Sequence, residues 1–187
     1  TVRADVPAEV FTTPYKNPVN AAPTDFRANL REATKLLKEA GYQVVENELV
    51  NATTKAPLTV EFLLADPLFE RVLLPYMQNL ERLGIKASVR QVDSSQYVER
   101  VQGFDFDLIV ATFAQSESPG NEQRDFWGSE AADKTGSRNL IGIKNKAVDT
   151  LIDRIVFAKD RAELVAATRA LDRVLLWNHY LVPQWHA

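Results

Sequence analysis

The chain has 187 residues, of which 45% are hydrophobic, and its 22 Lys and Arg against 25 Asp and Glu give a formal net charge of -3. This length suits one domain that buries about 70% of its unfolded surface. No window gathers basic and aromatic residues as a nucleic-acid surface does, and no apolar run approaches the roughly 18 residues needed to cross a bilayer, so we expect neither nucleic-acid binding nor a membrane span.

The first part of the chain predicts a lead-in, a helix and a hairpin. Residues 1–24 carry four prolines and predict an extended lead-in segment that lies on the body. From Thr24, apolar residues recur at steps of three and four until Gly41, which predicts an amphipathic helix ended by a left-handed glycine. Two apolar pairs within Gln43 to Asn51 predict a small hairpin.

Residues 25–187 are predicted to form one α/β unit with a candidate ligand-binding surface after its third strand. It begins with three strands that alternate with two helices, and crossovers of this length allow only parallel pairing. The third strand has no polar alternation except Thr112, which predicts a central strand covered on both faces. Pro75 lies within the first of these helices and predicts a kink or a restart there. The predicted elements are residues 58–64, 66–83, 85–89, 93–102 and 108–113.

The last third of the chain predicts an irregular stretch followed by two helices. Val148, Leu151, Ile152 and Ile155 define the first. The second has a capping pair, Asp160 with Glu163, and a buried stripe. The stripe comprises Leu164, Ala167, Leu171, Val174 and Leu175. Tyr180 to Trp185 predicts a short final strand.

A polar loop after the third strand is the candidate binding surface. The ten residues from Ala114 to Gln123 are small or polar and include Pro and Gly, so they cannot continue the strand. Ligands of open α/β sheets bind at the carboxyl ends of strands. The alternative is an ordinary surface connection.

The sequence does not support catalysis or a metal site. Asp105 and Asp107 point to the same side, but they lie at the amino end of the third strand, away from where ligands bind. Ser116 and Ser118 lack the glycine-flanked turn of a hydrolase nucleophile. Cys is absent, and the two His, His179 and His186, do not have a zinc-ligand spacing, so we expect no metal and no cofactor.

Several motifs, in this order, resemble the extracytoplasmic solute-binding proteins of ABC importers, peptide and nickel class, also called family 5. They are LLKEAGY (36–42), LERLGIKASVRQVD (80–93), QYVERVQGFDFDLI (96–109) and NLIGIKNKAVDTLID (139–153). SPGNEQ (118–123), FWGS (126–129) and VPAEVFTTPY (6–15) are similar to the subgroup that serves microcin C and peptide uptake.

The resemblance implies one lobe of a type II periplasmic-binding-protein-like fold, a parallel-rich sheet flanked by helices. Family members are much longer, with two lobes around a cleft, so it also implies a fragment that covers most of the second lobe. An aspartate that holds the ligand's amino group in peptide-binding relatives corresponds here to Gln115 or Ser116. An arginine found within the strand of some relatives corresponds to Val110, so recognition of a peptide carboxylate by that route is not expected.

The leading hypothesis is therefore a periplasmic substrate-binding component that captures a peptide or peptide-like solute between two lobes. The partners that the resemblance implies are that solute, the remaining lobe and an ABC permease in the inner membrane. The predicted ligand-binding residues are Phe113, Gln115, Ser116, Glu117, Ser118, Asn121, Arg138 and Asn139.

Two alternatives remain open from the sequence. One is a hydrolase of peptide-like substrates that uses the same loop with Asp66 or Glu117 as its base. The other is a protein-interaction module without catalysis, suggested by the aromatic end of the chain. Two interpretations of Phe126 and Trp127 also remain open. Their rings either stack on a ligand or pack on the body of the protein and hold the loop in place.

Overall fold

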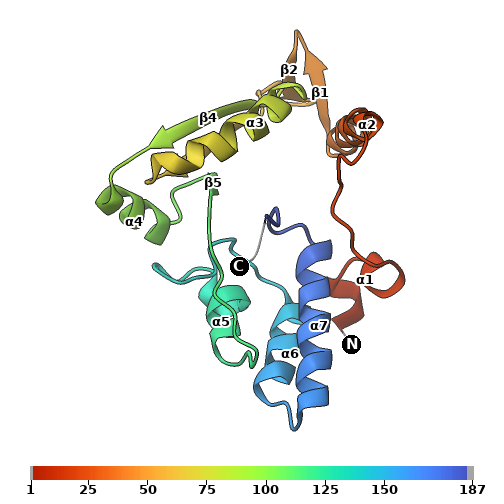
Figure 1. The fold of residues 1–187 in the computed structure, drawn as a ribbon, viewed down its shortest axis with the longest axis vertical. Coiled ribbons are helices and arrows are strands. Elements are labelled where there is room, and N and C mark those ends of the chain that lie inside the picture. Colours follow the sequence, from red (N-terminus) through yellow and green to blue (C-terminus); the bar gives the residue numbers. More distant parts are fainter. Residues whose placement is uncertain (1, 185–187) are drawn as a thin grey trace. The chain divides into compact units, whose positions relative to one another are not determined.

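The computed structural model describes residues 2–184 and divides the chain into two compact units (Figure 1). Unit 1 contains the described residues up to Lys16, Gln102–Phe104 and the described residues from Thr112 onward. Unit 2 contains Asn17–Val101 and Asp105–Ala111. Residues 2–16 and 17–24 of the predicted lead-in fall in different units.

Unit 2 is built on a parallel three-stranded sheet with the order β4-β3-β5. The strands are β3 (Thr59–Leu64), β4 (Lys86–Gln91) and β5 (Leu108–Ile109). Between them run η2 (Pro67–Phe69), α3 (Glu70–Glu81) and α4 (Ser94–Gln102). The predicted alternation of strand and helix with parallel pairing is confirmed.

The third strand is not central, in contrast to the prediction from its apolar run. β3 is the central strand, and β5 pairs with it at two positions only, Phe62 with Leu108 and Leu63 with Ile109. The apolar run is divided between the two units. Val110 packs on the apolar cluster of the sheet, whereas Phe113 packs on that of unit 1. Both residues are partly buried, although neither belongs to a strand. The lack of polar alternation in this run therefore indicated burial of its side chains and not a central position in the sheet.

The core of unit 2 lies between α3 and one face of the sheet. Phe62 and Leu64 of β3 point to this face, and they form a buried cluster with Leu73 of α3. The Asp66 side chain caps η2 by accepting a hydrogen bond from Leu68 N at 2.9 Å. α3 continues through Pro75 as a single helix, although proline has no N–H to donate to the preceding turn.

A helix and a hairpin complete unit 2. The helix α2 (Pro23–Glu39) ends before Gly41, whose φ of 87° confirms the predicted left-handed stop. The hairpin joins β1 (Tyr42–Val45) to β2 (Glu48–Asn51). Its two turn residues, Glu46 and Asn47, both have positive φ, as the twist of a two-residue hairpin requires.

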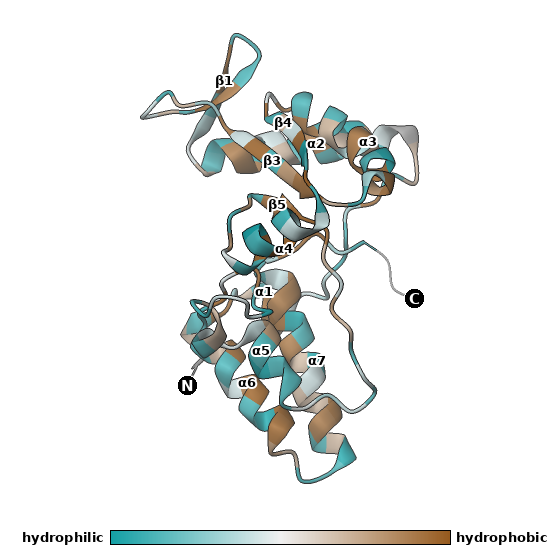
Figure 2. Ribbon diagram, turned by 90° about the vertical axis from the view of Figure 1, so that its left-hand side faces the viewer, coloured by the Kyte–Doolittle hydropathy of each residue, from teal (hydrophilic) through white to brown (hydrophobic). Residues whose placement is uncertain are grey.

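Unit 1 is helical in the part that the structure describes. Its elements are η1 (Val2–Asp5), α1 (Glu9–Thr12), α5 (Glu122–Trp127), η3 (Ser129–Ala131), α6 (Lys146–Val156) and α7 (Arg161–Trp177). Apolar and polar residues alternate along α6 and α7 in Figure 2, as expected for amphipathic helices. Both predicted helices are confirmed, and Asp160 caps α7 by accepting from Glu163 N at 2.8 Å.

The predicted final strand is absent from the part of it that the structure describes. Tyr180 to Gln184 has no strand, and Tyr180 packs against the helical core; Trp185 and His186 lie outside the described residues. No strand of the described part of unit 1 is available to pair with this segment. Tyr180 is held by side-chain contact with the helical core instead, while Leu181 and Val182 are exposed.

The first described residues lie on unit 1, as predicted for the lead-in, but the predicted extended conformation is wrong, because η1 and α1 form there. Arg173 of α7 donates hydrogen bonds to the backbone carbonyls of Glu9, Val10 and Thr13. Trp177 Nε1 also donates to the Thr13 carbonyl, at 3.2 Å. These carbonyls belong to α1 and its end, where a helix leaves acceptors unpaired.

Candidate functional site

The eight residues predicted to bind ligand all belong to unit 1, so the site can be described within that unit. The side chains differ in exposure. Phe113 is half-buried and Asn139 is buried. The remaining six are exposed: Gln115, Ser116, Glu117, Ser118, Asn121 and Arg138.

An aromatic cluster holds the loop at both ends. Phe113, at the start of the loop, packs its ring 5.6 Å from that of Phe126 and 4.6 Å from that of Trp127. Phe126 is 1% exposed and Trp127 is 5% exposed. Rings this buried have no face left for a ligand. The interpretation that these aromatics pin the loop is therefore supported over stacking on a ligand.

A buried glutamine that the sequence did not single out connects this cluster to the loop. Gln123 of α5 is 3% exposed. Its Nε2 donates to Gln115 Oε1 at 2.7 Å and to Glu122 Oε1 at 3.2 Å, and its Oε1 accepts from Trp127 Nε1 at 3.0 Å. A signal was present, because Gln123 lies three and four residues before Phe126 and Trp127 and so shares their buried helical face.

The backbone of the loop is anchored while the side chains of Glu117 and Ser118 stay exposed. Arg161 of α7 donates to the carbonyl of Glu117 at 2.6 Å. Ser116 Oγ accepts from Ser118 N at 3.2 Å. The loop therefore holds its path through contacts that leave the side chains of Glu117 and Ser118 exposed.

The carboxylate of Glu122 closes the loop at its far end. It accepts from Gly120 N at 2.8 Å. Burial alone would raise the pKa of Glu122, but the hydrogen bonds from the Gly120 N–H and the Gln123 amide outweigh that effect, and the pKa is lowered. Glu122 is thus an ionised acceptor at neutral pH.

Arg138 and Asn139, predicted as additional donors, have different roles. The Arg138 guanidinium lies 4.1 Å from the centroid of the Phe126 ring, in cation–π geometry, and remains exposed. Asn139 is 1% exposed, and its Nδ2 donates to the carbonyls of Gly128 and Ile143 while its Oδ1 accepts from Ile143 N. Because Asn139 uses its hydrogen-bonding groups within the chain, we leave it out of the proposed set.

Three of the carboxylates considered for catalysis make contacts within unit 2. Asp105 pairs with Arg100 at 2.8 Å, and Asp107 accepts from Glu61 N at 2.9 Å. Asp66, one of the two proposed bases of the hydrolase alternative, caps the turn before α3. Asp66, Asp105 and Asp107 thus each make a structural contact, whereas the side chain of Glu117, the other proposed base, is exposed in unit 1.

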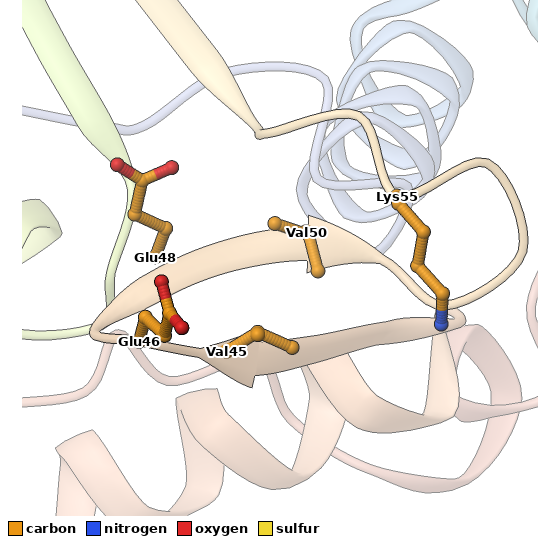
Figure 3. Close-up of a pocket in the computed structure, with 5 residues that line it drawn as sticks. All are labelled: Val45, Glu46, Glu48, Val50 and Lys55. Atoms are coloured by element: carbon orange, nitrogen blue, oxygen red, sulfur yellow. The ribbon is translucent and has the colours of Figure 1, made fainter.

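Unit 2 has a separate open pocket of about 320 Å³ at the hairpin (Figure 3). Figure 3 shows Glu46 and Glu48 at one end of it and Lys55 at the other. Glu48 forms an ion pair with Lys86 at 2.7 Å, and Val45 and Val50 line the pocket between the charges. None of the predicted ligand-binding residues contributes to this pocket.

Within residues 2–184, no group of three or more His, Asp or Glu side chains is arranged to hold a metal ion. No helix in the same range has both the length and the apolar character needed to cross a membrane. These findings concern the described residues alone.

Residues 2–135 match the model of the bacterial extracellular solute-binding proteins, family 5, middle part. This match covers more than half of the chain. The chain belongs to this family. The resemblance predicted from the motifs is thereby confirmed, and family 5 proteins are by this description extracellular.

Relatives and solved structures agree with this membership. The family 5 chain is 55% identical over 185 residues to a probable peptide-binding protein, YejA, of Agrobacterium fabrum, covering 99% of this chain and 30% of YejA. It is 34% identical over 181 residues to the peptidoglycan-binding protein YepA of the same organism, covering 97% of this chain and 29% of YepA. The chain thus spans about 30% of the length of these relatives.

The fold matches that of the oligopeptide-binding protein AppA of Bacillus subtilis, solved in complex with a nonapeptide. The TM-score is 0.69 at 20% identity, over 80% of this chain and 30% of AppA. At this identity the likeness concerns the fold alone. It confirms the α/β architecture of a type II periplasmic binding protein, with a parallel sheet and flanking helices.

Proposed function

We propose that this chain carries part of the solute-binding surface of an ABC importer receptor that captures a peptide or peptide-like solute in the periplasm. In this proposal the solute is held between two lobes, the remaining lobe comes from the same polypeptide, and the receptor delivers the solute to a permease in the inner membrane without chemical change. Membership of family 5, and relatives named for binding peptide or peptidoglycan, support it.

The single observation that carries the proposal for this chain is the loop from Gln115 to Ser118. Its side chains are exposed while its backbone is fixed by Arg161 and by the aromatic cluster of Phe113, Phe126 and Trp127. Such a loop presents amide, hydroxyl and carboxylate groups at positions set before the ligand arrives. Preorganised polar groups lose less entropy on binding than mobile ones do.

The peptide backbone matches these groups in chemistry. It offers N–H donors and carbonyl acceptors at regular spacing, and each hydrogen bond with it contributes about 1 kcal/mol net, more where one partner is charged. We propose Phe113, Gln115, Ser116, Glu117, Ser118, Asn121 and Arg138 as the residues of this surface.

The proposal is tested with the intact receptor, meaning the complete polypeptide in which these 187 residues occur. The purified receptor is mixed with random tetrapeptides, and retained and free peptides are identified by mass spectrometry. Stoichiometric retention of uncleaved peptides is the expected result. Accumulation of cleavage products would instead support the hydrolase alternative, and no retention at all would contradict a peptide receptor.

A further inference from the structure

A short chain of hydrogen bonds determines which way the amide of Gln115 points. Its starting point is the indole N–H of Trp127, which is a donor only. This N–H donates to Gln123 at 3.0 Å, so the atom it meets must be the carbonyl oxygen, Oε1. Nε2 of Gln123 must then face the opposite way, toward Gln115 and Glu122.

The carboxylate of Glu122 fixes the same orientation independently. A carboxylate is an acceptor only, and it lies 3.2 Å from Gln123 Nε2. The ionised state that the lowered pKa of Glu122 indicates removes its option of donating. With a donor-only group on one side and an acceptor-only group on the other, the buried Gln123 amide has one satisfactory orientation.

The orientation of Gln123 sets that of Gln115. Because Gln123 Nε2 donates across 2.7 Å, the Gln115 atom that receives this bond is Oε1. The exposed end of the Gln115 amide is consequently Nε2, with two N–H donors. No side chain or carbonyl in the part of the chain that the structure describes accepts from this Nε2.

We propose that Gln115 is a specificity-determining residue that donates from Nε2 to an oxygen acceptor of the solute, a peptide carbonyl or a carboxylate, with Gln123 as its positioning residue. This inference rests on the proposed function, because it takes the loop as the solute-binding surface. It deepens that function by naming the polarity of the contact. At this position the site selects an acceptor and disfavours an ammonium group, whose N–H bonds would face the N–H bonds of Gln115.

The decisive comparison is between Gln115→Glu and Gln115→Ala in the intact receptor. Glutamate retains an oxygen that accepts from Gln123, but its outward atom becomes an acceptor that repels another acceptor. The new carboxylate also shares Gln123 Nε2 with the carboxylate of Glu122, so a small loss of stability is expected. Gln115→Ala merely removes the donor. The most enriched tetrapeptide from the random mixture is titrated calorimetrically into each variant, and their melting temperatures are compared with that of the wild type.

We expect Gln115→Ala to weaken binding about tenfold, or about 1.4 kcal/mol, and Gln115→Glu to weaken it further, with a melting temperature lowered only slightly by repulsion from Glu122. Binding to Gln115→Glu that equals or exceeds binding to Gln115→Ala would overturn the donor role, although the receptor would still bind peptide. No retained peptide on the wild type would overturn the proposed function itself, and this inference with it.

The positioning role of Gln123 is tested by a double-mutant cycle. Gln123→Ala should weaken binding about threefold in the wild type and have no effect in the Gln115→Ala background, because its influence passes through Gln115. An equal loss of affinity in both backgrounds would show that Gln123 has a merely structural role.

The C-terminally amidated tetrapeptide separates the two possible acceptors of the solute. If amidation weakens binding only to the proteins that retain Gln115, the acceptor is the terminal carboxylate. If amidation leaves the four affinities of the cycle unchanged, the acceptor is a backbone carbonyl.

Discussion

The two units hold their backbones by different means. Unit 2 relies on regular pairing, with β3 hydrogen-bonded to β4 along its whole length and a hairpin closed by a two-residue turn. Unit 1 has long irregular stretches, and buried side chains satisfy their backbone groups: Asn139 bonds to Gly128 and Ile143, and Arg173 bonds to the carbonyls around α1. The comparison teaches that unit 1 depends on individual polar side chains and unit 2 on backbone geometry.

Among substitutions that test this difference between the units, the largest loss in the free energy of unfolding is expected at Asn139. Asn139→Ala leaves the N–H and the carbonyl of Ile143 buried without partners, at roughly 1–3 kcal/mol each before any relaxation, whereas the Gly128 carbonyl keeps its hydrogen bond from Ala131 N. We expect a loss of about 4 kcal/mol in the free energy of unfolding, measured by urea denaturation. The matched control is Asn121→Ala, an exposed asparagine of the same unit, which should change it by no more than about 0.5 kcal/mol. Equal effects of the two variants would contradict the account.

In unit 2 the corresponding test is a pair of glycines. Gly84 has a φ of 82°, and a Cβ there would lie 2.7 Å from Leu49 N and 3.1 Å from the carbonyl oxygen of Asn47. Gly41 has a φ of 87° with nothing within 4 Å. Gly84→Ala should cost about 3 kcal/mol, from the left-handed conformation and the clash together, and Gly41→Ala about 1 kcal/mol from conformation alone. Thermal unfolding of both variants checks this, and a cost at Gly41 as large as at Gly84 would refute the close approach.

A smaller effect is expected at Arg173. Arg173→Ala removes one donor from each of three carbonyls around α1, although that of Glu9 keeps its bond from Thr13 N and that of Thr13 keeps its bond from Trp177. We expect a loss of about 2 kcal/mol together with faster hydrogen exchange in residues 9–13. Arg169→Ala, one turn earlier and exposed, is the matched control and should leave this exchange unchanged. If the exchange in residues 9–13 were alike in the two variants, Arg173 would not be the anchor of this segment.

The smallest effect is a pH dependence that comes from Glu122. The pKa of Glu122 is lowered in the folded chain relative to its ordinary value of 4.5, so its stabilising contribution is complete above that value and is lost as the pH falls through the folded pKa. Glu122→Gln should therefore have a lower melting temperature than the wild type at pH 7. The difference between the two melting temperatures should become smaller below about pH 4. A gap that stayed constant with pH would argue against an ionised acceptor at this position.

The regular elements could be predicted from the sequence because their signals are local. The apolar steps up to Gly41, the cap at Asp160 and the alternation around Val89 all depend on neighbours along the chain. The central position of β3, the burial of Asn139 and the role of Gln123 depend on residues that only the fold brings together. The run from Leu108 to Phe113 misled because it serves two cores, one in each unit.

The same distinction applies to the candidate site. Composition identified the loop, since Pro, Gly and polar residues after an apolar run cannot extend a strand. It could not separate exposed side chains such as Glu117 from Asn139, because both are polar and only burial distinguishes them. Whether Gln115 offers a donor or an acceptor to a ligand could be inferred only once the hydrogen-bond partners of Gln123 were known.

The most direct test of the central claim, that this loop is the solute-binding surface, is to replace Gln115, Ser116 and Glu117 together by Ala in the intact receptor. Calorimetric titration of the most enriched tetrapeptide should show affinity weakened about tenfold or more, with the free energy of unfolding changed by no more than about 0.5 kcal/mol, because the three side chains are exposed. Unchanged affinity at unchanged stability would contradict the claim and would move the search for the site to another surface.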